Sequence, residues 1–158
     1  MKKIGIALCK IILVVVFGFF MFIQLQKPER SEADFSEVEE IVMNQMDEYG
    51  LVKQDNLAIK STFSIDPAAY TNIAYYKSSD AMDVREVILV QFENEAMAQS
   101  FEKAAQNRID SQINAFDGYA PEQVKLLKGA KVYSQVNFAI YVTSENSAEV
   151  VKAFKGAL

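Results

Sequence analysis

The sequence predicts an α+β domain with a four-stranded, mostly antiparallel sheet covered by helices on one face, behind one N-terminal transmembrane helix. After residue 70, two segments rich in β-branched and aromatic residues precede a segment with helical periodicity, and the same order then follows again. An apolar run opens the chain. The predicted element order is α-α-β-β-α-β-β-α. We divide the chain into a transmembrane signal-anchor (1–25), a linker (26–33) and an extracytoplasmic α+β domain (34–158).

The N-terminal anchor is predicted from the length of its apolar segment. Residues 11–23 contain no polar side chain, and the segment reaches 22 residues, from Ile4 to Leu25, when Lys10 and Gln24 are included. About 20 residues are needed to cross the hydrocarbon core as a helix. Because more positive charge precedes this segment than follows it, we expect a single-pass protein of the cell membrane with its N-terminus in the cytoplasm.

Two processing events are alternatives to an uncleaved anchor. A secretory signal would need a cleavage site of small residues, and the first candidate, Ser31-Glu32-Ala33, lies well past the apolar run and behind a charged stretch. Lipidation would use Cys9, but Leu8 is too large for the usual acylation motif, and the apolar run follows this cysteine instead of preceding it. The sequence therefore favours the uncleaved anchor.

The first part of the domain is predicted to be helical. Asp34 can cap an amphipathic helix that ends before Gly50. Residues 51–70 give a weaker signal, with a short helix at Asp55–Ser61 and a helical turn that starts at Asp66-Pro67.

The second part supplies the sheet and the longest helix. The predicted elements are strands at 71–76 and 84–92, a helix at 94–116, a Pro121-led turn through Leu127, a hairpin with strands at 131–135 and 138–143, and a last helix from 146 to 158. The strand at 84–92 is apolar on both faces, which is typical of a central strand.

Composition excludes several classes of function. After the first thirty residues, 11 basic and 20 acidic side chains remain, so residues 31–158 carry a net charge of −9 and would repel nucleic acid. The chain has no histidine, which removes Ser-His-Asp triads, Cys-His pairs and typical zinc sites. Cys9 is the sole cysteine and lies in the apolar segment, so the domain has neither a thiolate nucleophile nor an internal disulfide.

Three patterns could carry chemistry or binding, and each has a simpler explanation. Ser100 and Lys103 match the S-x-x-K of penicillin-recognising enzymes, but the accompanying motifs are absent. Four carboxylates could bind Ca²⁺, although without the spacing of an EF-hand, namely Asp80, Asp83, Glu93 and Glu95. Aromatic residues near strands could form an exposed docking face, although core packing explains most of them, namely Tyr70, Tyr75, Tyr76, Phe92, Tyr133, Phe138 and Tyr141. We assign no catalytic, cofactor-binding or metal-binding residues.

Four stretches resemble a known family. They are Phe63–Pro67 (FSIDP) before the first strand, Tyr119–Gln123 (YAPEQ) and Leu126–Val132 (LLKGAKV) after the long helix, and Asn137-Phe138 before the last strand. On these stretches, residues 34–158 resemble an uncharacterised bacterial family, domain of unknown function 4358, found mainly in Gram-positive lineages. The resemblance implies an exported, membrane-associated domain, often tethered as a lipoprotein. It supplies no established activity and no functional residues.

The chain departs from that family at two places. The usual lipobox cysteine at the end of the apolar segment is missing, which favours a transmembrane tether. Val136 stands where a glycine is common in the hairpin turn, and a β-branched residue argues against a tight two-residue turn with positive φ.

These observations favour a non-enzymatic binding or interaction module at the bacterial cell envelope. Its expected partners are the membrane, through the N-terminal helix, and a protein or another envelope component. One alternative is a carboxylate-dependent envelope hydrolase or transferase, which would need two acidic residues converging in a pocket. A second alternative is a structural subunit of a membrane assembly, in which the apolar helix itself makes the contacts.

Overall fold

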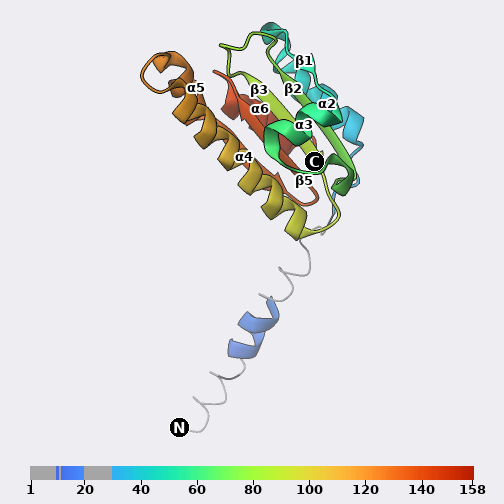
Figure 1. Ribbon diagram of the computed structural model, residues 1–158. Coiled ribbons are helices and arrows are strands. Elements are labelled where there is room, and N and C mark those ends of the chain that lie inside the picture. Colours follow the sequence, from blue (N-terminus) through green and yellow to red (C-terminus); the bar gives the residue numbers. More distant parts are fainter. Residues whose placement is uncertain (1–9, 11, 20–29) are drawn as a thin grey trace.

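The computed structural model describes residues 10, 12–19 and 30–158 (Figure 1). The predicted transmembrane helix at 1–25 therefore lies in large part outside the described residues, as do Cys9 and residues 26–29 of the predicted linker. Residues 12–19 are helical. Among the helices that the structure describes, none combines the length and the apolar character that crossing a membrane requires.

An antiparallel sheet forms the centre of the domain. In residues 30–158 it has five strands in the order β1-β2-β3-β5-β4, and each neighbouring pair is antiparallel. The strands are β1 (Val52–Lys53), β2 (Asn72–Lys77), β3 (Glu86–Gln91), β4 (Lys131–Gln135) and β5 (Phe138–Thr143). The α+β class is confirmed, but the prediction of four strands was wrong. The missed strand, β1, is two exposed residues long, so it has no apolar alternation to detect.

Helices α2, α3 and α4 begin at side-chain caps, and the cap of α2 at Asp34 was predicted from the sequence. The carboxylates of Asp34 and Asp55 and the amide oxygen of Asn94 accept hydrogen bonds from the first-turn N–H groups. The helices of the domain are α2 (Phe35–Asn44), α3 (Asn56–Phe63), α4 (Glu95–Phe116), α5 (Pro121–Gly129) and α6 (Ser147–Gly156), with short 3₁₀ turns at Asp47–Tyr49 and Pro67–Ala69.

Helix α5 replaces the turn that was predicted at this position. Pro121 occupies its first turn, where the missing N–H costs nothing. Val124 and Leu127 are three residues apart. They are buried together against Phe116, the last residue of α4, and against Val84, which precedes β3. This small separate core makes the segment helical.

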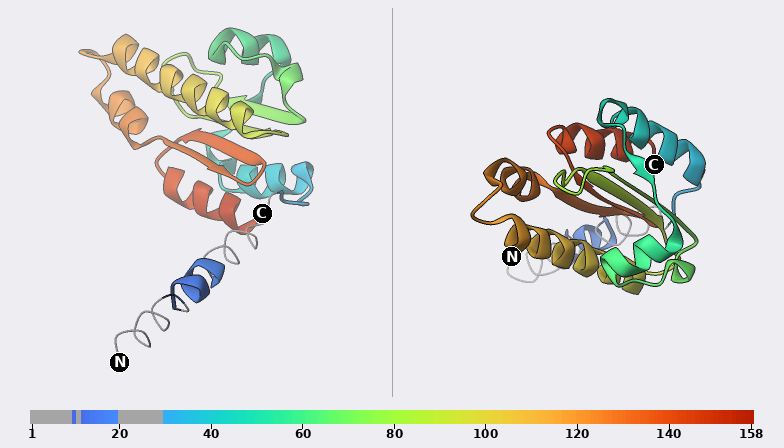
Figure 2. Two further views of the ribbon diagram at one scale, coloured as in Figure 1. Left: turned by 90° about the horizontal axis from the view of Figure 1, so that it is seen from below. Right: turned by 45° about the horizontal axis from the view of Figure 1, so that its top comes forward.

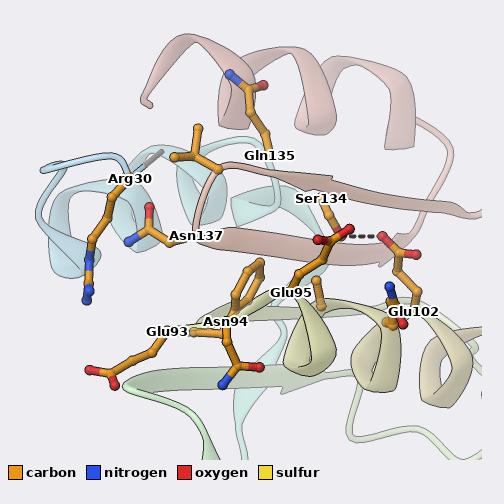
Figure 3. A pocket seen from close by; sticks show the side chains of 12 residues that line it. Arg30, Glu93, Asn94, Glu95, Glu102, Ser134, Gln135 and Asn137 are labelled. Carbon is orange, nitrogen blue, oxygen red and sulfur yellow. Dashed lines mark hydrogen bonds between the residues drawn. The ribbon is translucent and has the colours of Figure 1, made fainter. Parts of the chain in front are cut away.

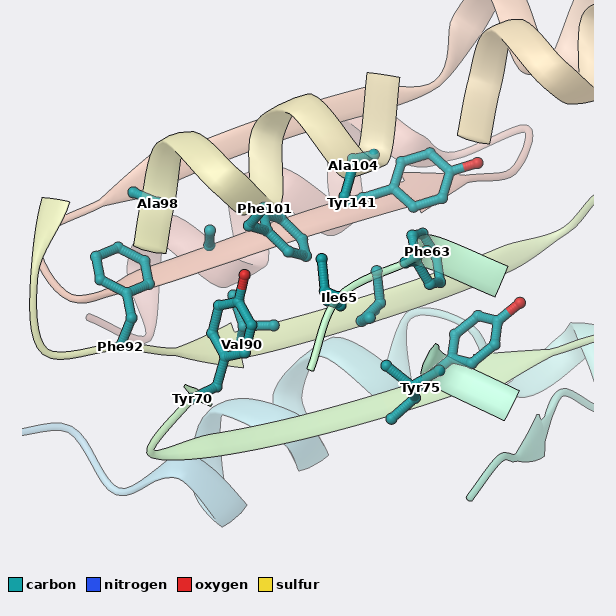
Figure 4. Close-up of a cluster of buried hydrophobic side chains, with 14 of the residues drawn as sticks. Phe63, Ile65, Tyr70, Tyr75, Val90, Phe92, Ala98, Phe101, Ala104 and Tyr141 are labelled. Atoms are coloured by element: carbon teal, nitrogen blue, oxygen red, sulfur yellow. The ribbon is translucent and has the colours of Figure 1, made fainter. Parts of the chain in front are cut away.

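The domain has three layers, with helices on both faces of the sheet (Figure 2). Helices α3 and α4 pack on the face that carries Ile88, Val90 and Tyr141, whereas α2 and α6 pack on the face that carries Val87 and Leu89. The prediction of helices on one face was therefore wrong. Helices cover both faces because β3 is apolar on both, and a strand of this kind must be buried on each side. Figure 4 shows the core on the α3–α4 side, where Phe101 of α4 lies over the strands.

The hairpin between β4 and β5 has a tight turn. Gln135 pairs with Phe138, so Val136 and Asn137 alone form the loop, and Val136 has a φ of 56°. The argument that this valine disfavours a two-residue turn with positive φ was wrong. A β-branched residue in this region of φ is a genuine outlier, and the backbone is strained at this turn.

Replacing Val136 by glycine is expected to raise the free energy of unfolding by about 1 kcal/mol, because glycine reaches positive φ without the Cβ clash. The matched control is Gly50→Ala, at a φ of 57° in open space, which should lower the free energy of unfolding by about 1 kcal/mol. Urea unfolding of the full chain in detergent micelles measures both. An unchanged or reduced stability of the Val136→Gly variant would contradict the strained turn.

Candidate functional site

A charged pair lies inside the domain, between α4 and the sheet. Glu86, the first residue of β3, is 1% exposed. Arg108 of α4 donates two hydrogen bonds to it, from Nε to Oε1 at 3.0 Å and from Nη2 to Oε2 at 3.1 Å. Such a bidentate pair is among the stronger hydrogen-bonded contacts in proteins. It ties the second half of α4 to the central strand.

Two tyrosines complete the shell of donors around the Glu86 carboxylate. The hydroxyl of Tyr75 on β2 donates to Oε2 at 2.6 Å, and that of Tyr141 on β5 donates to Oε1 at 2.9 Å. Thr143 donates in turn to the Tyr141 hydroxyl at 2.8 Å. Each carboxylate oxygen thus accepts two hydrogen bonds, which is its ordinary capacity. Glu86 has no lone pair left with which to act as a general base.

The aromatic rings of this cluster pack on one residue of α3. Phe63 meets the rings of Tyr75 and Tyr141 edge to face, at centroid distances of 5.1 and 6.0 Å. Figure 4 shows both tyrosine hydroxyls directed toward the same end of the sheet. We call Glu86, Arg108, Tyr75, Tyr141 and Thr143 the buried polar cluster.

The pKa values follow from burial and from the charge of Glu86. Burial, followed by the nearby carboxylate, raises the pKa of Tyr75 and of Tyr141 well above the ordinary value of 10.0. Burial alone would lower the pKa of Arg108, but its hydrogen bonds to Glu86 and the attraction between the two charges raise it. The cluster therefore holds the Arg108–Glu86 ion pair and two neutral phenols at physiological pH.

The sequence interpretation missed this cluster, although a signal was present. Glu86 precedes the apolar run Val87–Val90 of the central strand, and Arg108 falls in the inward stripe of the long helix. Opposite charges on two elements that are both expected to be buried indicate an internal ion pair, because neither is stable there alone.

A polar groove lies at the opposite end of β3 from this cluster (Figure 3). It has a volume of about 550 Å³ and runs between the first turns of α4 and the β4–β5 hairpin. The hydroxyl of Ser134 on β4 donates to Glu102 of α4 across it, at 2.6 Å. Its lining residues are Arg30, Phe92, Glu93, Asn94, Glu95, Ala98, Gln99, Glu102, Ser134, Gln135, Val136 and Asn137. We call it the hairpin groove.

The chain enters the domain beside the hairpin groove. The N–H of Ser31 donates to Asn137 Oδ1 at 2.7 Å, and the Ser31 hydroxyl donates to the Leu158 carbonyl at 3.1 Å. Asn137 is 4% exposed, and its amide nitrogen has no hydrogen-bond partner among residues 30–158. The first bond fixes the orientation of the amide, which leaves a buried donor in the wall of the groove.

A second groove of about 590 Å³ lies at the other end of the sheet, between α5 and the start of α6. Arg85, Lys125 and Lys131 line it together with Glu122 and Glu145. The near balance of its charges selects no class of ligand. Arg85 is in addition committed to Asp83, with Nε at 2.8 Å from the carboxylate.

The Ser-Lys pattern and the proposed calcium ligands are not assembled into sites. Ser100 and Lys103 are both exposed on α4. Asp80 and Asp83 precede β3, while Glu93 and Glu95 follow it, so a strand about 20 Å long separates the two pairs. The hydrogen bonds of Arg85 outweigh burial and hold the pKa of Asp83 below its usual value. Within the described ranges no three His, Cys, Asp or Glu side chains gather as a metal site would require.

The aromatic residues do not form an exposed face. Tyr70, Tyr75 and Tyr141 are buried, and Tyr76 and Tyr133 are half-buried under α2 and α6. The Tyr76 hydroxyl donates to Glu39 of α2, and the ring of Tyr133 packs against Phe154 of α6. The hypothesis of an open tyrosine-bearing sheet face was wrong, because helices cover both faces.

The fold and its buried polar cluster define a three-layer α+β domain. A family model described as "Domain of unknown function (DUF4358)" matches residues 44–144, and the chain belongs to this family. The family resemblance seen in the sequence is thereby confirmed. The matched region contains the buried polar cluster and the β4–β5 hairpin. No curated protein and no solved structure matches the chain.

Removing one partner of the buried pair is expected to destabilise the domain more than removing both. Arg108→Met should lower the free energy of unfolding by about 3 kcal/mol, because Glu86 is left charged and buried without its partner. The double variant Glu86→Gln with Arg108→Met should recover part of that loss. Chemical denaturation of the full chain measures both. A double variant less stable than Arg108→Met alone would contradict the pairing.

High pH is expected to unfold the domain through its buried tyrosines. The folded pKa of Tyr75 and Tyr141 lies above the unfolded value of 10.0, so their contribution is fully present below pH 10 and is lost as the pH rises further. The loss should approach about 1.4 kcal/mol per pH unit for each residue. The midpoint of urea unfolding as a function of pH measures it. Tyr75→Phe should flatten this dependence, and an equally steep loss in that variant would rule out Tyr75 as a source.

Proposed function

We propose that this chain is a non-enzymatic binding or interaction module of the bacterial cell envelope. Its N-terminal segment would anchor it in the membrane, with the domain on the extracytoplasmic side. The support for the anchor is the apolar segment and the excess of positive charge before it. The support for the domain's side of the membrane is the same charge asymmetry.

The observation that carries the binding role is the contrast between the interior and the hairpin groove. The ionisable groups inside the domain satisfy one another, since Glu86 already accepts four hydrogen bonds. The hairpin groove is open, is lined by amides and carboxylates, and lies where the chain enters the domain. An open polar surface next to a membrane tether suits recognition of a neighbour better than chemistry that must exclude water.

A carboxylate-dependent hydrolase or transferase has less support. Such an enzyme raises the pKa of one acid by placing it near a second acid or in an apolar pocket. Glu86 is the deeply buried carboxylate of residues 30–158, and it faces an arginine. The carboxylates of the hairpin groove, Glu93, Glu95 and Glu102, are exposed to water.

Replacing the anchor tests the proposal in cells. Residues 1–25 are exchanged for one unrelated membrane helix that places the domain outside the cytoplasm and, separately, for one that keeps it inside. We expect the crosslinks that the domain forms in intact cells to persist with the outward helix and to disappear with the inward one, because the domain carries the function.

Retention of the crosslinks with the inward helix would overturn the extracytoplasmic location. Their loss with both helices would instead support the structural-subunit alternative, in which the native helix makes the contacts. Protease treatment of intact cells serves as the control, since it must digest the domain in the outward variant alone.

A further inference from the structure

The outer edge of β4 is open, and its last two residues, Ser134 and Gln135, line the hairpin groove. β4 is the last strand of the sheet, with β5 on its other side. Its residues are exposed or half-buried, whereas every residue of β5 is buried. Within residues 30–158, no backbone or side-chain hydrogen bond other than those to β5 reaches the backbone of β4. An edge strand of this kind can accept a further strand.

Helix α4 forms the second wall beside that edge. Glu95, Ala98 and Glu102 lie on one face of α4, at helical spacing, and line the same groove as Ser134 and Gln135 of β4. The bond between Ser134 and Glu102 joins the two walls, so a peptide that binds here displaces it and takes over its hydrogen-bonding groups. A channel between a free strand edge and a helix fits an extended peptide, which pairs through its backbone on one side and places side chains on the other.

The charges of the groove select a cationic peptide. Glu93, Glu95 and Glu102 contribute three carboxylates to the lining, against Arg30 as the basic residue. The buried amide nitrogen of Asn137 calls for an acceptor, which a peptide carbonyl supplies once the wall of the groove opens slightly. An anionic lipid headgroup would meet carboxylates here, and two copies repel each other because residues 31–158 carry a net charge of −9.

We propose that the hairpin groove binds an extended peptide segment bearing lysine or arginine, which adds as a strand to the outer edge of β4. The inference rests on the proposed binding role and names its site and its class of partner. The segment belongs to a protein close to the bilayer. If the apolar helix ends at Leu25, the five residues 26–30 extend no more than about 18 Å before Ser31 is fixed to the domain.

A library of short blocked peptides tests this assignment with the full chain in detergent micelles. Each position of the library is fixed in turn as lysine, arginine, alanine or glutamate, and binding is measured by fluorescence anisotropy. We expect peptides with a fixed lysine or arginine to bind at least about tenfold more tightly than those with glutamate. Backbone N-methylation of the tightest peptide should abolish its binding, because strand addition needs its N–H groups.

Matched charge variants locate the site. Glu95→Gln combined with Glu102→Gln should weaken the tightest peptide about tenfold, whereas Glu149→Gln, an exposed position on α6 away from the groove, should leave binding unchanged. Hydrogen exchange should show new protection, when the peptide is bound, of those amides in Lys131–Gln135 that point away from β5. A peptide that is held only by attraction to the acidic side chains would not protect these amides, so the protection is specific to strand addition.

Equal binding of lysine and glutamate peptides, or binding that survives N-methylation, would overturn the inference. So would the absence of binding by any peptide of the library. Crosslinks of the domain that persist in cells in those cases would leave the proposed function standing. Concentration-dependent self-association through β4, or binding to vesicles of anionic lipid that the two glutamate changes abolish, would replace the peptide by another occupant.

Discussion

Four hydrogen bonds that end on the Glu86 carboxylate join α4 to three adjacent strands of the sheet. Arg108 supplies two of them from α4, and Tyr75 and Tyr141 supply the others from β2 and β5, on either side of β3. A carboxylate inside a protein is costly unless it is paired and fully hydrogen-bonded. Because the donors must converge on one point, they determine where α4 crosses the sheet and at which residue.

The position of α4 determines in turn the shape of the hairpin groove. This helix has 22 residues and is therefore about 33 Å long. Arg108 holds its second half to the strands, and its first turns, with Glu95 and Glu102, form one wall of the groove at the other end of β3. A rigid helix transmits this placement along its length, so the interior of the domain sets the geometry of its proposed binding surface.

The class of the domain could be predicted from the sequence because its long elements have clear periodicity, and the bounds of the 131–135 and 138–143 hairpin are correct. β1 could not be predicted, because two exposed residues carry no pattern. The helices on both faces were implicit in the apolar β3, but only the packing of the folded chain assigns α2 and α6 to one face. The hairpin groove requires β5 to pair with β3 and leave β4 at the sheet edge, and no local pattern shows that order.

Native-state hydrogen exchange on the chain with Glu86→Gln and Arg108→Met tests most directly whether the buried pair holds α4 in place. The account predicts that the amides of α4 then exchange through a local opening, at a lower free energy than those of β3 and β5. In the unaltered chain, the helix and the strands should share the free energy of global unfolding. Equal protection of α4 and the sheet in the altered chain would contradict the account.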